Sequence, residues 1–208
     1  MRLPVFVLSA AVLAAACSSG AATTSPSAAA FNAASAPVQT PAVGASATIG
    51  AGPTASPVDI SSWIEVAPEG QGFGVPMPGK ATKSTMTIPA VNAPTTIWTY
   101  TDDSGRAFQV ARSKYPKGAL AGTSKVVLDS IAKGMTTWLA DSTLQRQTDV
   151  TIGGHAGRRY LLVSPKSNAE GIFVVAGDFV FTVCLTYEPG NADPGLIEAF
   201  LGSFMLSV

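Results

Sequence analysis

No charged side chain occurs between Arg2 and Asp59, and this gap limits the part of the chain that can fold into a domain. Residues 18–57 consist almost wholly of Ala, Ser, Thr, Pro and Gly. Such a segment has too few large apolar side chains to offset the entropy lost on ordering, so we expect a disordered tether. As a flexible chain its r.m.s. span is roughly 35 Å. The residues that follow, about 150, suffice for one domain with a sound core.

The first residues have the features of an export signal. Arg2 gives a positive start, and residues 3–16 form an apolar run that is too short to span a bilayer. Small residues precede Cys17. The stretch resembles the lipobox of bacterial lipoproteins, usually Leu-Ala-Gly/Ala-Cys, although Ala14 stands where Leu is most common and Leu13 comes one position early. The alternative is an ordinary signal peptide, cleaved near the residue before the cysteine.

The lipobox resemblance implies that the thiol of Cys17 carries diacylglycerol and that cleavage makes this residue the new N-terminus. A mature lipoprotein carries two or three acyl chains, and two or more chains bind a membrane stably. We therefore expect a signal peptide at residues 1–16, a lipidated cysteine and tether at residues 17–60, and one globular domain at residues 61–208. This organisation predicts an exported protein, anchored to the outer face of the cell membrane.

The domain region has the pattern of an α+β fold. Glycine and aspartate turns, such as residues 102–105 and 177–178, join apolar runs that predict hairpins and hence an antiparallel sheet. Helical spacing of apolar residues predicts helices at residues 124–140 and 194–204. We expect about six to eight strands flanked by these two helices, with the helices packed on the sheet. The predicted strands are residues 61–68, 73–78, 95–101, 106–113, 144–152, 158–164, 171–176 and 179–187.

A series of short motifs resembles a widespread bacterial domain, the PsbP-like domain. The pattern is F-x-V-x-x-P-G, a strand ending in Tyr-Pro, G-x-x-G-R before a strand, a glycine hairpin and a closing F-L-x-S-F. The stretches that match it are GFGVPMPGKATKS, FQVARSKYP, VTIGGHAGRRY, FVVAGDFVFTVCLTY and FLGSFML. The resemblance covers roughly residues 65–206 and implies an α/β/α sandwich. It also implies a mostly non-enzymatic family of assembly factors, binding accessories and exported proteins, and it assigns no functional residue.

Residues 74–81, GVPMPGKA, have the Gly-x4-Gly-Lys spacing of a phosphate-binding loop. Such a loop binds phosphate through main-chain N–H groups and is followed by a helix. Pro76 and Pro78 have no N–H to donate, and Ala81 stands where a Ser or Thr would bind magnesium. The next residues alternate like a strand. The sequence therefore predicts a strand and a proline-rich turn, and no nucleotide binding.

The remaining chemical motifs are weak. Ser130 and Lys133 match the S-x-x-K motif of penicillin-recognising enzymes, but the companion S-D-N and K-T-G motifs are missing. His155 is the sole histidine, and we interpret it as a solvated loop residue. Asp102 and Asp103 are expected in a hairpin turn. We predict no catalytic residue, no cofactor and no metal site.

Cys184 lies within the apolar run of residues 179–187. In an exported protein whose other cysteine is blocked by lipid, it has no disulfide partner. The sequence predicts a small buried core residue.

Three residues are candidate ligand contacts: Trp138, Arg158 and Arg159. The two arginines are adjacent on a predicted strand, so they face opposite sides of the sheet. We expect one to meet solvent and the other to pair with an acid or line a groove.

The preferred function is a binding or accessory module for an envelope protein or cell-wall component. The alternatives are a carrier of a lipid or small apolar ligand, in a cavity between helix and sheet lined by Trp138 and the last strand, and an enzyme that uses Ser130. With 13 basic and 13 acidic side chains, the sequence indicates no nucleic-acid partner.

Overall fold

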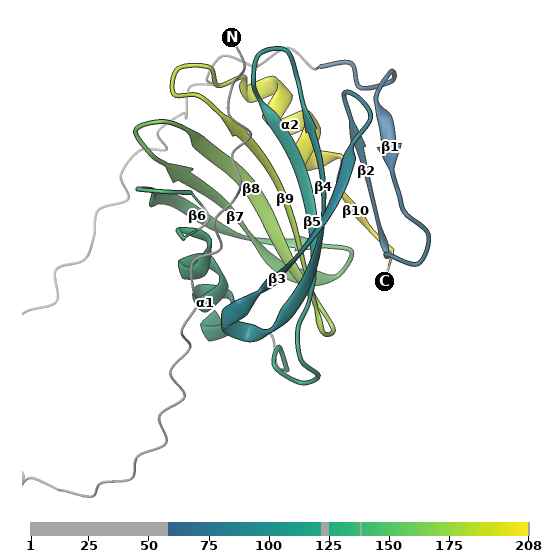
Figure 1. Ribbon diagram of the computed structural model, residues 1–208, viewed down its shortest axis with the longest axis vertical. Helices are drawn as coiled ribbons and strands as arrows, with labels where there is room; N and C mark the ends of the chain where they lie inside the picture. Colours follow the sequence, from purple (N-terminus) through teal and green to yellow (C-terminus); the bar gives the residue numbers. More distant parts are fainter. Residues whose placement is uncertain (1–57, 122–124, 138, 208) are drawn as a thin grey trace, which may run out of the picture. The chain divides into compact units, whose positions relative to one another are not determined.

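The computed structural model describes residues 58–121, 125–137 and 139–207, and its largest element is a seven-stranded antiparallel sheet (Figure 1). The strand order is β3-β4-β5-β9-β8-β7-β6, with every neighbouring pair antiparallel. The strands are β3 (Thr82–Ile88), β4 (Ala93–Thr101), β5 (Ala107–Lys114), β6 (Thr143–Ile152), β7 (His155–Val163), β8 (Asn168–Ala176) and β9 (Phe179–Tyr187). A single 3-10 turn, η1 (Pro89–Val91), joins β3 to β4.

A second sheet has three strands in the order β1-β2-β10: β1 (Ile64–Val66), β2 (Phe73–Met77) and β10 (Met205–Leu206). Its central strand, β2, contains Pro76, which cannot donate a main-chain hydrogen bond. Strand β10 pairs only with Phe73 and Gly74. Beyond that point one side of β2 has no partner strand, so the missing N–H of Pro76 leaves no gap in the ladder.

The two described helices lie on opposite faces of the large sheet (Figure 1). Helix α1 (Lys125–Met135) packs through Leu128, Ala132 and Met135 against side chains of β7, β8 and β9. Helix α2 (Pro194–Gly202) covers the other face together with the small sheet, and Phe200 is fully buried there. This arrangement confirms the predicted α+β fold with an antiparallel sheet between helices.

Helix α2 begins at a capping sequence. The Asp193 carboxylate accepts a hydrogen bond from the main-chain N–H of Leu196, and Pro194 occupies the first helical position. Both features are typical of helix N-termini, because the cap satisfies a free N–H and proline has none to lose.

Helix α1 is shorter than the sequence predicts: it ends at Met135, whereas the apolar spacing predicts a helix to residue 140. Thr136 and Thr137 donate their hydroxyl groups to the main-chain oxygens of Lys133 and Gly134. These bonds satisfy the last carbonyls locally and close the helix. The eight predicted strands omit β10, and they omit β3 although its residues alternate like a strand.

The alternation of β9 is confirmed. Phe181, Val183, Leu185 and Tyr187 belong to the core on the α2 side, and Phe179 packs against it. Cys184 points to the α1 side and is 5% exposed, which confirms the buried position predicted for it. Among the described helices, none is long and apolar enough to cross a bilayer.

Candidate functional site

Residues 74–81 form the end of β2 and a turn, as their prolines predict. Gly74 to Met77 lie in β2, the chain turns at residues 78–80, and the strand β3 follows instead of a helix. Gly79 approaches the ring of Tyr100 so closely that a Cβ atom there would overlap it. The glycine is therefore required for packing, and the segment lacks the helix N-terminus that a phosphate loop uses.

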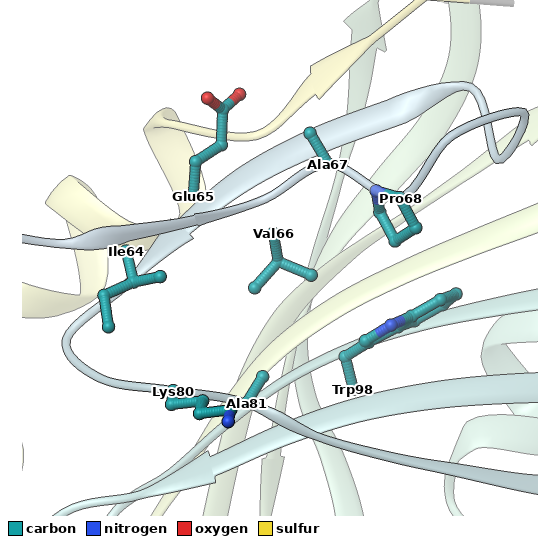
Figure 2. Close-up of a pocket in the computed structure, with 8 residues that line it drawn as sticks. All are labelled: Ile64, Glu65, Val66, Ala67, Pro68, Lys80, Ala81 and Trp98. Carbon is teal, nitrogen blue, oxygen red and sulfur yellow. The ribbon is translucent and has the colours of Figure 1, made fainter.

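This turn forms one wall of an open hollow of about 320 Å³ (Figure 2). Strand β1 forms the opposite wall, and Ile64 and Val66 point from it into the hollow, to the side where Lys80, Ala81 and Trp98 lie, as Figure 2 shows. Glu65 lies between them in sequence and points away, as alternation in a strand requires. The hollow is lined by Ile64, Glu65, Val66, Ala67, Pro68, Lys80, Ala81 and Trp98.

The floor of the hollow is buried and one wall is open. Trp98 is 5% exposed and Val66 8% exposed, because both also belong to the core, whereas Ile64 is 50% exposed. A single exposed aliphatic side chain is common on protein surfaces, but Ile64 lines the same hollow as the buried Val66 and Trp98. The hollow therefore offers an apolar contact surface continuous with the core.

One lysine lines the hollow, and a second lies over the ring of Trp98. Lys80 lines the hollow, and the Lys83 Nζ lies 5.9 Å from the centre of the Trp98 ring. Within the described residues, neither ammonium group has a carboxylate within salt-bridge distance. A cation over an indole ring is attracted by its negative face, and both lysines remain available to an anionic group.

Arg158 and Arg159 lie elsewhere, on the two faces of β7. The Arg158 side chain is 3% exposed, and it donates hydrogen bonds to Asp129 (Nη1, 2.5 Å), Asp149 (Nε, 2.9 Å) and Gln147 (Nη1, 3.1 Å). Arg159 is 23% exposed and binds Glu170 at 2.7 Å and Glu198 at 2.6 Å through Nη2.

Arg158 is the buried arginine that pairs with acids, as expected of one of the two, and Arg159 is the one that partly meets solvent; the difference from the expectation is that Arg159 is paired with acids as well. Neither is among the residues that line the hollow. Trp138, the third candidate, lies outside the described residues. Its role, like that of the arginines in ligand binding, stays a prediction.

The ion pairs shift several pKa values. Burial lowers the pKa of Arg158, but the hydrogen bonds to Asp129 and Asp149 outweigh it, and the pKa is raised. The hydrogen bond to Glu198 raises the pKa of Arg159. In return, the arginines lower the pKa values of Asp129 and Glu198. All these groups stay charged near neutral pH, so they hold the structure rather than transfer protons.

The weak catalytic motifs have structural roles. The Ser130 hydroxyl donates to the main-chain oxygen of Val126 at 2.9 Å, on the exposed side of α1. His155 begins β7 opposite Ile152 and is half-buried, so its interpretation as a solvated loop residue is wrong. Asp102 is confirmed in the hairpin turn, where it accepts hydrogen bonds from the main-chain N–H groups of Ser104 and Arg106. Among the described residues, no group of three His, Cys, Asp or Glu side chains is placed to hold a metal ion.

Sequence reasoning missed the hollow, its lining residues Ile64 and Trp98, and the contact between Lys83 and Trp98. Ile64 and Trp98 lie in predicted strands, but nothing in the alternation shows that two separate sheets meet there. Lys83 lies opposite Trp98 because β3 pairs with β4. The strand-like alternation after residue 81 is the signal that could have placed these two residues together, if its pairing with β4 had been inferred.

Neither known family profiles nor curated proteins match this sequence. Among solved structures, the solution structure of cyanobacterial PsbP (CyanoP) from Synechocystis sp. PCC 6803 matches with a TM-score of 0.53 at 11% identity, over 79% of this chain and 98% of that one. A Pseudomonas aeruginosa protein of unknown function matches with a TM-score of 0.35 at 15% identity, over 54% of this chain and 86% of that one. The chain therefore has a PsbP-like fold.

Proposed function

We propose that this protein is an exported, membrane-anchored binding or accessory module, without enzymatic activity, for an envelope protein or a cell-wall component. Three features support the proposal. The apolar N-terminal run ends at Cys17, an uncharged segment separates it from the domain, and the domain has a PsbP-like fold. Together they support a folded module held at a distance from a membrane.

The binding role is carried by one observation, the hollow between β1 and the β2–β3 turn. It exposes Ile64 and is lined by Trp98 and Lys80, and Lys83 lies over the Trp98 ring. Neither lysine has a salt-bridge partner among the described residues. A surface of this kind suits an apolar group that carries a carboxylate nearby, such as a hydrophobic side chain next to an acidic residue, or an acidic cell-wall peptide.

The alternative function, a lipid carrier, requires a cavity between helix and sheet, and the space there is small. The hollow between α1 and the sheet, lined in part by Ile131 and Met135, measures about 20 Å³. That volume holds about one water molecule, whereas ligand cavities measure about 300–1,000 Å³. The phenylalanines of β9 are packed in the core on the other face. The described structure thus favours a surface contact over an enclosed ligand.

Membrane anchoring is tested by replacing Cys17. The Cys17→Ala chain should leave the membrane fraction and appear in the soluble fraction, because the thiol that carries the lipid is gone. Cys184→Ala is the matched control, since it removes the other cysteine and should leave the protein membrane-bound. The anchor assignment fails if Cys17→Ala protein stays in the membrane fraction to the same extent as the unaltered protein.

The binding surface is tested by site-specific crosslinking on intact cells. A photo-crosslinking amino acid at position 80, at the rim of the hollow, should give one defined adduct, either an envelope protein or a cell-wall fragment. The adduct should disappear when Ile64→Asp is added, because a charge replaces the apolar contact. A probe at position 148, on the distant strand β6, is the control. Equal adducts from positions 80 and 148, or an adduct that survives Ile64→Asp, would exclude the hollow.

A further inference from the structure

The seven-stranded sheet has two edges, and they differ in how well they are protected against pairing. Strand β6 carries a register shift between Leu144 and Arg146, and it exposes the charged side chains of Arg146 and Asp149. Bulges and charges of this kind are the usual means by which sheet edges avoid pairing with other chains. Strand β6 is therefore an edge that is protected against pairing with another chain.

The other edge is strand β3 (Thr82–Ile88), called the β3 edge from here on. It pairs with β4 over seven residues with no register shift, and its sequence TKSTMTI has one charge, Lys83. Five of its seven residues are exposed: Thr82, Lys83, Ser84, Thr85 and Thr87. Outside the β3–β4 ladder, no main-chain hydrogen bond in the described part of the chain involves these seven residues. The β3 edge is regular, rich in β-branched residues and open.

Pro94 shows which main-chain groups of β3 point outward. It lies opposite Thr87 and has no N–H to donate, so this pair is of the non-hydrogen-bonded type. Because the two types of pair alternate along an antiparallel ladder, the main-chain groups of Lys83, Thr85 and Thr87 face the open side. These three residues present a row of unpaired donors and acceptors.

We propose that a second copy of this chain pairs with the β3 edge, antiparallel and centred on Thr85. This is the register in which all seven residues of each strand face a partner. Thr85 then lies opposite Thr85 of the second copy, and each Lys83 lies opposite a Thr87. Threonine pairs stabilise antiparallel strands, and no like charges face each other.

Registers centred on other residues of β3 pair fewer than seven residues of each strand, and the charge of Lys83 disfavours one of them further. Centring the pair on Lys83 would place the two ammonium groups directly opposite each other and leave four residues of each strand unpaired. The pairing centred on Thr85 is a closed two-fold contact, so it ends at a dimer and does not propagate. It joins the two large sheets into one continuous sheet across the axis.

Disulfide trapping on the full-length chain tests the dimer. The chain carries Cys17→Ala, so the remaining native thiol is the buried Cys184. Residues opposite each other in a hydrogen-bonded pair have Cα atoms about 5.5 Å apart, which fits a disulfide. Mild oxidation of the Thr85→Cys protein should therefore give a covalent dimer.

Two controls define the register. Thr87→Cys places its two thiols four residues apart along the strands, about 13 Å, and should give no dimer by itself. A mixture of Lys83→Cys and Thr87→Cys proteins should give a mixed dimer, because these positions face each other. Ser104→Cys, in an exposed turn, measures random collision. The proposal is overturned if Thr85→Cys gives no more dimer than Ser104→Cys, or if Thr87→Cys alone gives as much.

Molar mass in solution provides a second measurement without oxidation. The Cys17→Ala chain should have the mass of a dimer, and adding Thr85→Lys should produce a monomer because two lysines would meet on the axis. Ser104→Lys is the matched control and should leave the dimer intact. A monomer before Thr85→Lys is added, or capture of Thr85→Cys by a different protein in place of a second copy, overturns the pairing.

Discussion

Arg158 and Arg159 are neighbours in β7, yet they bind carboxylates on opposite faces of the sheet. Arg158 contacts Asp129 of helix α1, and Arg159 contacts Glu198 of helix α2. Two consecutive residues thus attach both described helices to one strand. Because successive side chains of a strand point to opposite faces, adjacent positions can reach both helices at the same point along the strand.

The first prediction concerns Arg158. Its replacement by Ala should lower the free energy of unfolding by about 2 kcal/mol, because a buried guanidinium with three partners is lost while the freed carboxylates can regain water. Lys125→Ala removes an exposed i,i+4 pair with the same Asp129 and should change stability by less than about 0.5 kcal/mol. Urea unfolding followed by circular dichroism measures both. If Arg158→Ala lowers the free energy of unfolding by no more than Lys125→Ala does, the Arg158 pairs do not stabilise the fold.

The second prediction is acid destabilisation. The hydrogen bond from Arg159 lowers the pKa of Glu198 below its ordinary 4.5, and that from Arg158 lowers the pKa of Asp129 below 3.8. A carboxylate with a lowered pKa stabilises the fold fully above its unfolded pKa, and this stability is lost as pH falls through the native pKa. The urea concentration at the unfolding midpoint should therefore decrease as the pH is lowered below about 4.5.

Glu198→Gln tests how much the pair of Arg159 and Glu198 contributes to this pH dependence, because Gln does not titrate. Its urea midpoint should depend less on pH below about pH 4.5 than that of the unaltered protein, by a small amount since Glu198 is 62% exposed. Glu69→Gln is the matched control, as that carboxylate has no salt bridge within the described residues. A pH dependence that Glu198→Gln leaves unchanged would contradict the assignment.

Much of the fold could be predicted from the sequence, because its signals are local. The turn at residues 102–105 and the alternation of β9 each depend on a few consecutive residues, and both are found in the structure. The residues of β3 alternate like a strand, but they give no signal of where the strand pairs, since most of its side chains are exposed on both faces. Strand β10 has two residues, and it is a strand only through its pairing with Phe73 and Gly74 of β2. Pairing of this kind is decided by tertiary contacts.

The candidate site was largely beyond the reach of sequence reasoning. Ile64 and Trp98 are separated by 34 positions and belong to different sheets. The arginine partners are equally distant: Asp129 lies 29 residues from Arg158, and Glu198 lies 39 residues from Arg159. The sequence indicates that the arginines face opposite sides, but only the packing of each helix shows which acid each one meets.

The third prediction concerns the crowded centre of the sheet. Gly171 of β8 lies between β7 and β9, and a Cβ atom there would lie 2.5 Å from the main-chain oxygen of Val183. Gly171→Ala should cost about 3 kcal/mol or more, since the backbone must move. Gly202→Ala, at the end of α2 with no atom near the added carbon, should be neutral or slightly stabilising. Thermal unfolding compares the two, and similar melting temperatures would refute the close packing.

The fourth prediction concerns the reactivity of Cys184. Burial raises the pKa of its thiol to about 11, and the side chain is covered by the packing beneath α1. Thiol reagents attack the thiolate, so the native Cys17→Ala chain should react very slowly near neutral pH. In denaturant the same chain should react fully and give one thiol per molecule, which a chromogenic disulfide reagent counts. Rapid reaction of the native chain would contradict the prediction and would mean that the α1 side of the sheet opens readily. A slow reaction whose rate changes in parallel with global unfolding would place Cys184 in the most stable part of the domain.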